Sequence, residues 1–390
     1  MLLTNLRIVL PDRVLDDAFL LILQGKISRL GAMASPEYVA LAEATPVVDI
    51  VDGDGATAVP GFIDIHHHGN HGADVRDASA DALETICRGQ LEAGVTTFLG
   101  TVISSDIATM CRAAEAVTAF RGTRPETNLY GIHYEGPFLS PKYAGAQKRD
   151  VLRAPDEESI KTLLDAAGDD LKMITIAPEL PGALAAIERL SAKGIRVALG
   201  HTDADTVTAR EAFARGATIA THLFNAMRPL HHREPGIIGC ALTDPAAFTE
   251  VILDGYHVHE DTVRLILAAK GADRVVGISD AMRAAGMPDG PSELGGQPVM
   301  KRGCEVRLAD GTLAGSALTQ DRALRFLHET IGADLPTATR VLSAAPAAAL
   351  GLTDRGVLAR DKRADLLLLN EDLTIRRRML GGRFVTADLS

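Results

Sequence analysis

The sequence predicts an α/β protein: a (β/α)8 TIM-like barrel with a small β-sandwich domain formed by both chain termini. Three observations indicate the barrel. Eight short apolar runs recur from about residue 58, segments with helical periodicity separate them, and side chains able to bind a metal end several of the runs. The C-terminal strand ends of a parallel barrel meet in one ring, where such side chains converge. An open doubly wound sheet is the alternative, but residues at the ends of several different strands favour the barrel.

The eight runs are the predicted barrel strands. They are mostly rich in Val, Ile, Thr and Phe, and in chain order they are AVPGFIDIHHH, VTTFLGTVI, NLYGIHYEG, LKMITIAPE, IRVALGHT, ATIATHLFN, FTEVILDGYH and RVVGISDAM. The stretches between them carry helix signals. SADALETICRGQLEAG begins with an N-cap serine and closes with glycine, TDADTVTAREAFARG has the same signals, and PGALAAIERLSAKG has proline near its start and glycine at its end.

The two ends of the chain predict a second, smaller domain. β-favouring runs alternate with Pro-Asp and glycine turns in the N-terminal stretch NLRIVLPDRVLDDAFLLILQGKISRLG. The same alternation recurs in the C-terminal stretch GVLARDKRADLLLLNEDLTIRRRMLGGRFV. We therefore expect residues 1–57 and 346–390 to build one small β-domain together, with the barrel over residues 58–345 inserted between them.

Composition narrows the class of protein. The 390 residues are 46% hydrophobic and 23% charged, as in a soluble globular protein, and 40 basic against 51 acidic residues give a net charge of −11. This balance disfavours nonspecific nucleic-acid binding, which needs a basic footprint. The N-terminus is a poor signal peptide, no run of about 20 apolar residues indicates a membrane span, and the four cysteines form no CxxC pair. We expect a cytoplasmic protein with neither nucleic-acid nor membrane partners.

Three consecutive histidines end the first predicted strand. His66 and His68 are two positions apart, so on a strand they point the same way and can share a metal. His67 points to the opposite face, where we expect a structural role. Taken alone, a His-x-His pattern is weak evidence for a metal site.

Four further potential ligands occupy matching places in other runs. Glu135 ends the third run, His201 the fifth, His222 the sixth and Asp280 the eighth. Each of these, taken singly, is more often a satisfied buried polar group. Six such groups at the ends of barrel strands, however, favour a metal site at the barrel mouth, with His66 and His68 as ligands.

The sequence resembles the N-acetylglucosamine-6-phosphate deacetylases of the amidohydrolase superfamily from about Pro60 to Asp321. The motifs that carry this resemblance are PGFIDIHHHG, HYEGPFLSPKYAGAQ, GHTDA, THLFNAMRPLHHREPG, DGYHVH, SDAM and GTLAGSALT. The resemblance implies that Glu135, His201 and His222 are metal ligands and that Asp280 is the catalytic aspartate. Some members lack the His-x-His pair and use one metal; this chain keeps His66 and His68, which implies one or two metals per chain.

The same resemblance implies a set of substrate contacts. Many relatives carry histidine where this chain has Gln147, which leaves the contact to the acyl group or sugar open there. Arg233, eleven residues after His222, is implied to bind a phosphate and is expected near the barrel mouth. The implied substrate-binding residues are Ala146, Gln147, Asn225, Ala226, Arg233, His257, Leu313, Ala314 and Gly315.

The implied reaction removes the acetyl group from N-acetylglucosamine 6-phosphate. A divalent metal polarises an amide carbonyl and lowers the pKa of bound water toward about 7. A carboxylate such as that of Asp280 takes up the proton and returns it to the amine. Zn²⁺ is the default metal for these ligands, and Fe²⁺ or Mn²⁺ also fits. The resemblance further implies a homodimer.

Other functions stay open at this stage. The same chemistry on N-acetylgalactosamine 6-phosphate or another N-acyl amino sugar is the nearest alternative. A cyclic-amide hydrolase on the same barrel is more distant, and the phosphate-type arginine motif argues against it. A non-enzymatic interaction barrel is a third alternative, which the retention of all six candidate ligand and base residues disfavours.

Overall fold

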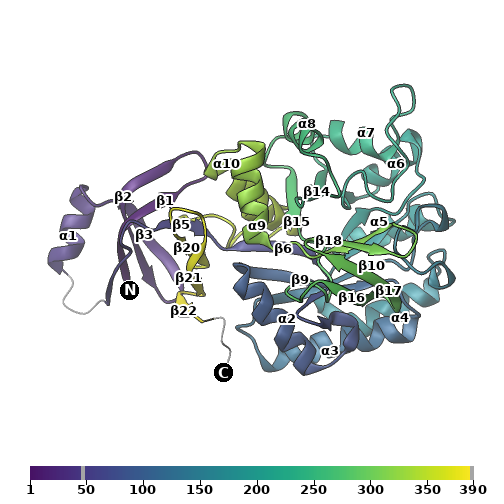
Figure 1. Ribbon diagram of the computed structural model, residues 1–390, viewed down its shortest axis with the longest axis horizontal. Helices are drawn as coiled ribbons and strands as arrows, with labels where there is room; N and C mark the ends of the chain where they lie inside the picture. Colours follow the sequence, from purple (N-terminus) through teal and green to yellow (C-terminus); the bar gives the residue numbers. More distant parts are fainter. Residues whose placement is uncertain (45–48, 387–390) are drawn as a thin grey trace.

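The structure is a computed structural model that describes residues 1–44 and 49–386. It has two parts that lie side by side, a barrel surrounded by helices and a β-domain that contains both chain ends (Figure 1). Among the described residues, no helix has both the length and the apolar character needed to cross a membrane.

The barrel contains the eight predicted strands. Each pairs in parallel with its neighbours in chain order, and the last returns to the first through a parallel bridge between His67 and Ala281. The Asp280 amide also donates to the His66 carbonyl at 2.9 Å across this seam. The strands are β6 (Phe62–His67), β9 (Val95–Ile103), β10 (Leu129–Glu135), β11 (Leu171–Ile176), β12 (Arg196–Leu199), β13 (Ala217–Ala220), β14 (Phe248–Ile252) and β15 (Val275–Ile278). The predicted barrel is confirmed.

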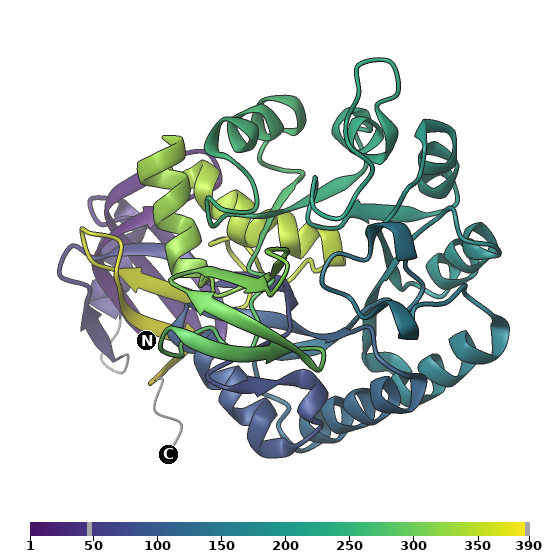
Figure 2. The same ribbon diagram turned by 45° about the vertical axis from the view of Figure 1, so that its right-hand side comes forward.

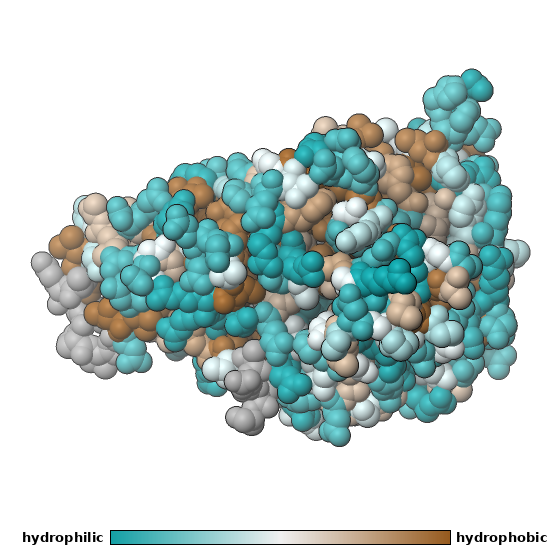
Figure 3. All heavy atoms as spheres, in the orientation of Figure 1, coloured by the Kyte–Doolittle hydropathy of each residue, from teal (hydrophilic) through white to brown (hydrophobic). Residues whose placement is uncertain are grey.

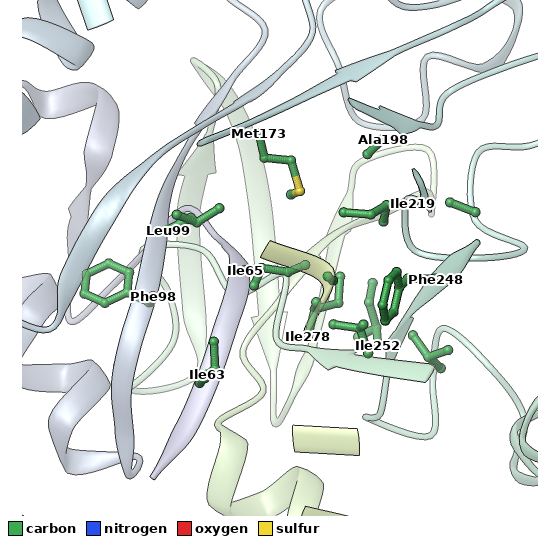
Figure 4. Packing of buried hydrophobic residues seen from close by; sticks show 14 of the residues in the cluster. Ile63, Ile65, Phe98, Leu99, Met173, Ala198, Ile219, Phe248, Ile252 and Ile278 are labelled. Carbon is green, nitrogen blue, oxygen red and sulfur yellow. The ribbon is translucent and has the colours of Figure 1, made fainter. Parts of the chain in front are cut away.

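Helices connect these strands as the sequence signals indicate. Ser79 accepts a hydrogen bond from the Ala82 amide at the start of the first barrel helix, and Asp205 caps another through the Thr208 amide. The connecting helices are α2 (Ala80–Glu92), α3 (Ile107–Thr123), α4 (Glu157–Ala167), α5 (Ala183–Ala192), α6 (Thr206–Ala214), α7 (Gly236–Thr243) and α8 (Glu260–Lys270), and α9 (Gln320–Arg325), α10 (Leu335–Thr339) and α11 (Ala345–Leu350) follow the last strand. Buried apolar side chains from strands and helices form one continuous core, part of which Figure 4 shows from Ile63 on β6 to Ile278 on β15.

Strands from both ends of the chain form a single eight-stranded sheet. Its order is β22-β21-β20-β5-β1-β2-β3, with β4 paired to β1, so N-terminal β5 lies beside C-terminal β20. Side chains from strands along this path share one apolar core, and the Ile27 amide on β3 donates to the Lys362 carbonyl at 2.8 Å. The sheet thus folds over its own core as a sandwich does. Its strands are β1 (Leu2–Val9), β2 (Val14–Leu23), β3 (Lys26–Ala32), β4 (Ile50–Asp52), β5 (Thr57–Pro60), β20 (Leu366–Leu369), β21 (Ile375–Leu380) and β22 (Arg383–Val385).

Three features were not predicted from the sequence. Helix α1 (Pro36–Ala44) packs Tyr38 and Leu41 against Phe19, on the outer side of the terminal sheet.

A four-stranded antiparallel sheet follows the last barrel strand. Its strands are β16 (Gly290–Leu294), β17 (Gln297–Arg302), β18 (Glu305–Leu308) and β19 (Leu313–Ser316). The Ser316 amide donates to the Asp280 carbonyl at 2.8 Å, which ties β19 to the end of β15. The sheet lies across one end of the barrel (Figure 2). A short ribbon of β7 (Gly69–Asn70) and β8 (Ala73–Asp74) lies beyond β6.

Candidate metal centre and substrate cavity

The six predicted ligand and base residues converge at the C-terminal ends of the barrel strands. They form two groups of three, His66 with His68 and Asp280, and Glu135 with His201 and His222. Within each group the candidate ligand atoms all lie within 4.8 Å of one another, and all six residues are buried. The topology explains the convergence, because residues far apart in sequence end strands of the same closed parallel barrel.

Three of these residues have a left-handed backbone conformation. His201, His222 and Asp280 each follow a strand by two residues, and their φ angles are +47°, +26° and +49°. This region costs a residue other than glycine about 1–2 kcal/mol. The surrounding structure holds it in place, since the His201 carbonyl accepts from the Ser140 amide at 2.9 Å. Backbone strain of this kind is concentrated at functional sites.

Glu135 lies between the two groups. One carboxylate oxygen is 3.0 Å from His201 Nε2 and 3.2 Å from His222 Nε2. The other is 3.3 Å from His68 Nε2. One carboxylate can therefore contact a cation in either group.

Hydrogen bonds fix which ring nitrogens of two histidines carry hydrogen. His201 Nδ1 is 3.1 Å from the Tyr143 carbonyl, and His66 Nδ1 is 3.1 Å from the Glu250 carboxylate. Both partners only accept, so in each neutral ring Nδ1 carries the hydrogen and Nε2 presents a lone pair.

These lone pairs face other acceptors. His201 Nε2 lies 3.1 Å from His222 Nε2, and His66 Nε2 lies 3.5 Å from both Glu135 and Asp280. Lone pairs that converge without a hydrogen between them repel, and a cation between them removes the repulsion. The donor set of imidazole nitrogens and carboxylate oxygens fits a divalent transition metal.

The carboxylates also set the charge of the cluster. Burial disfavours a charge on His66, but Glu135, Glu250 and Asp280 outweigh it and raise the pKa of His66 well above its usual value. Burial likewise opposes charge on His68, yet hydrogen bonds to Asp280 and Glu135 raise its pKa to about 9. The cluster therefore attracts positive charge, either as protons or as a cation.

A cavity of about 240 Å³ opens onto the centre. Five of the six residues line it, while His66 lies behind them with no exposed surface. Leu294 and Thr312 of the four-stranded sheet region complete one wall. The predicted substrate-binding residues that line this cavity are Ala146, Gln147, Asn225, Ala226, His257, Leu313 and Gly315.

Two predicted substrate residues do not line the cavity. Ala314 points into the apolar core under the four-stranded sheet, between Leu313 and Gly315, which do line it. Arg233 lies on the exposed segment 229–234, which projects from the molecule before α7 (Figure 1) and is hydrophilic in the surface view (Figure 3). Its guanidinium contacts His232 at 2.7 Å. Arg233 is thus not at the cavity of its own chain, contrary to the expectation from its distance to His222 in sequence.

The side chains of Gln147 and His257 are held in place. Gln147 donates to Glu135 Oε2 at 2.7 Å and accepts from the Ser104 amide at 3.1 Å. His257 Nδ1 is 2.6 Å from the fully buried Asp254 carboxylate, which leaves Nε2 for the cavity. Both residues therefore face the cavity in one preferred orientation.

Several buried polar residues behind the ligands were not predicted. Glu250 on β14 has no exposed surface and contacts His66, as described above. His133 on β10 bonds to Thr101 and Thr175, and burial holds its pKa well below the usual value. Each lies inside a run already identified as a strand, and a polar residue in a buried strand is the signal that could have found it. His67 contacts Ser279 and Asn70 and does not line the cavity.

Comparison with known proteins gives matches over nearly the whole chain. The profile of the amidohydrolase family matches residues 57–385. The N-acetylglucosamine-6-phosphate deacetylase of Lysinibacillus sphaericus is 39% identical over 337 residues, which cover 86% of this chain and 87% of that protein. The N-acetylgalactosamine-6-phosphate deacetylase of Escherichia coli O157:H7 is 36% identical over 351 residues, which cover 89% and 92%.

A solved structure agrees along almost the full length. It is a variant of N-acetyl-D-glucosamine-6-phosphate deacetylase from Mycobacterium smegmatis in complex with N-acetyl-D-glucosamine 6-phosphate. The TM-score is 0.91 at 34% sequence identity, and the match covers 99% of each chain.

Proposed function

The chain belongs to the amidohydrolase family, and on that premise we propose that it hydrolyses N-acetylglucosamine 6-phosphate to glucosamine 6-phosphate and acetate. The observation that carries this proposal is the cavity that both three-residue groups share with seven of the nine residues matched to substrate contacts. The cavity thus combines a place for a metal with a place for a sugar.

The side chains support amide hydrolysis. When a divalent cation is bound, it polarises the amide carbonyl and makes water more acidic. Glu135 and Asp280 are the carboxylates that line the cavity; Glu135 is engaged by histidines of both groups, whereas Asp280, among the described residues, contacts only the histidines of its own group. Asp280 is therefore the group we propose to take the proton from the attacking water and return it to the departing amine.

For the metal centre we propose one required and one additional position. Glu135, His201 and His222 hold the required cation, and His66 and His68 build the second position beside Asp280. Zn²⁺ suits these ligands best, and Fe²⁺ or Mn²⁺ is accommodated by the same donors.

We propose that the chain is a homodimer and that Arg233 binds the phosphate. A guanidinium suits this role, because it pairs with two oxygens at once. Since the 229–234 segment projects away from the cavity of its own chain, we place Arg233 at the cavity of the second copy.

A second candidate substrate is N-acetylgalactosamine 6-phosphate. The E. coli O157:H7 relative named for that substrate is 36% identical, close to the 39% of the L. sphaericus relative. Turnover of both sugar phosphates by the metal-loaded protein, side by side, tests the proposal. A higher kcat/KM for the galacto epimer would replace the first substrate with the second. If the protein turned over neither sugar phosphate and bound no divalent metal, the non-enzymatic interaction barrel would become the favoured alternative.

Two further proposals concern the chain as a whole. We propose a cytoplasmic location, supported by the free thiols of Cys87, Cys111, Cys240 and Cys304, which suit a reducing compartment. We also propose the division into a terminal domain of residues 1–57 and 346–390 and a barrel of residues 58–345. The pairing of β5 with β20 supports a terminal domain built from both ends of the chain.

A further inference from the structure

Glu250 is a third carboxylate at the centre of the barrel, behind the cavity. It sits on β14 with no exposed surface. One of its oxygens is 3.1 Å from His66 Nδ1 and accepts from the His222 backbone amide at 3.2 Å. A single oxygen of Glu250 is thus bonded to one residue from each of the two metal groups.

These contacts hold both groups in a productive geometry. The bond to Nδ1 turns the His66 ring so that Nε2 faces Glu135 and Asp280. The bond to the His222 amide supports a residue whose φ is +26°, and the Glu250 carbonyl also accepts from the Leu223 amide at 2.8 Å. Glu250 therefore clamps the turn that carries His222 through both its side chain and its backbone.

Charge explains why this position holds a carboxylate. A buried carboxylate is unfavourable unless positive charge lies near it. Two divalent cations would carry four positive charges, against two negative charges from Glu135 and Asp280. Glu250 supplies a third negative charge within the same buried cluster, and it lies on the His66 side of that cluster.

We propose that Glu250 is a positioning residue that orients His66 and the His222 turn so that both groups hold a divalent cation at once. This inference rests on the metal centre of the proposed function. The Nδ1 side of the His66 ring is held by the Glu250 side chain, whereas the turn that carries His222 also has the backbone bond from Leu223. Loss of the Glu250 side chain should therefore weaken the His66/His68 position first.

Zn²⁺ binding to chelator-treated protein tests this without any activity assay. Wild type should bind two equivalents per chain. Glu250→Gln keeps an acceptor oxygen but loses the charge, and the second equivalent should bind about 10–100-fold more weakly, the range seen when groups behind metal ligands are changed. Glu250→Leu removes the acceptor as well, and about one equivalent should remain. Loss of the second equivalent while the first still binds is the selective effect that a purely structural role would not produce.

Asp365→Asn is the matched control, because Asp365 is also a buried carboxylate but lies just before β20 of the terminal sheet, where its side chain accepts from Arg363 and from the Gly381 amide. An equal loss of Zn²⁺ in this control would overturn the inference, because the loss of any buried carboxylate would then weaken Zn²⁺ binding to the same extent. Unchanged binding in Glu250→Gln would also overturn it, even if Glu250→Leu failed to fold. A wild type that binds one equivalent would overturn the inference and the additional metal position but leave the proposed deacetylation standing, and a wild type that binds none would overturn all three.

Discussion

Gln147 donates a hydrogen bond of 2.7 Å from its side-chain amide to the carboxylate of Glu135. The other end of the amide accepts from the Ser104 backbone, so Gln147 is fixed between the chain and a proposed metal ligand. Because the position also lines the cavity, it joins substrate binding to the shape of the metal centre.

Gln147→Ala should therefore affect metal binding as well as substrate binding. It removes the donor to Glu135 Oε2, and we expect metal affinity to fall about 10–100-fold. Gln147→His is the informative partner, because histidine restores a ring N–H at the position where many relatives carry it. We expect this variant to retain metal affinity and to change mainly KM. Zn²⁺ competition titrations alongside steady-state kinetics check both, and an Ala variant with wild-type metal affinity would contradict the role of the bond.

Asp280→Asn should retain the fold and the metal that we propose Glu135, His201 and His222 hold, but lose turnover. An amide cannot accept and return the proton, and proton transfer of this kind contributes about 10²–10⁴-fold to a rate. We expect kcat to fall within that range. The measurement is kcat per bound metal ion, so that weaker occupancy at the His66/His68 position does not mimic the effect. Near-normal kcat in the metal-loaded variant would rule out Asp280 as the base.

Mutations should distinguish the contributions of the two proposed metal positions. His201→Ala should abolish activity, because it removes a proposed ligand of the cation that we propose is required. Replacing both His66 and His68 with alanine should lower the metal content by about one equivalent per chain and leave part of the activity. Metal analysis of the purified variants checks this. A double variant with wild-type metal content would show that the His-x-His pair is not a metal site.

The convergence of the six candidate ligand and base residues could be predicted because the barrel topology brings them together. Parallel strands in a barrel end in one ring, and the two-residue period of a strand aims His66 and His68 to one side. Glu250 could not be paired with His66 in this way, since 184 residues separate them and the sequence shows no register between β6 and β14. The same pattern-based reasoning missed β16–β19, whose strands mix buried and exposed residues rather than forming a buried apolar run.

The position of Arg233 could not be predicted from the sequence for a different reason. The eleven residues from His222 to Arg233 can either stay at the barrel mouth or turn away from it, and the sequence does not specify which path the backbone takes. Here the exposed residues at 229–234 lead away from the cavity, and His231 and Glu234 pair across a tight turn at the tip.

The raised pKa of His68 predicts a dependence of stability on pH in the metal-free protein. The folded pKa of about 9 lies above the ordinary value of 6.5. The folded state therefore holds this proton more tightly, and the resulting stability is fully present below pH 6.5 and lost as pH rises to about 9. We expect the Tm of chelator-treated protein to fall across this window. His68→Ala should remove that part of the slope, and a Tm that responds identically in both proteins would refute the assignment.

The same proton competes with the metal. A cation at the His66/His68 position must displace it, so Zn²⁺ affinity should rise with pH up to about 9. Calorimetric titrations in buffers of different ionisation enthalpy should report proton release on binding at pH 7. Absence of any release would mean that His68 is already neutral in the metal-free chain.

Mixing two impaired variants can decide whether Arg233 acts on the second copy. Arg233→Ala removes the proposed phosphate ligand, and a charge-assisted pair of this kind contributes about 1.5–3 kcal/mol, so kcat/KM should fall about tenfold to more than a hundredfold. Asp280→Asn lacks the base but keeps Arg233. If Arg233 reaches the other cavity, a heterodimer of the two has one complete site, formed by Asp280 of one copy and Arg233 of the other. If Arg233 acts within its own chain, the heterodimer has none.

We therefore expect kcat/KM to rise above the residual values of both variants when the two are unfolded together and refolded, and to stay at those residual values when each is refolded alone. Statistical mixing makes half of the dimers heterodimers with one working site in two, so recovery should approach a quarter of the wild-type rate. The unphosphorylated sugar is the control substrate, because the loss in Arg233→Ala should be specific to the phosphate. No recovery in a refolded mixture that contains heterodimers would place Arg233 at its own cavity, and an equal loss on both sugars would assign it to the fold rather than to the phosphate.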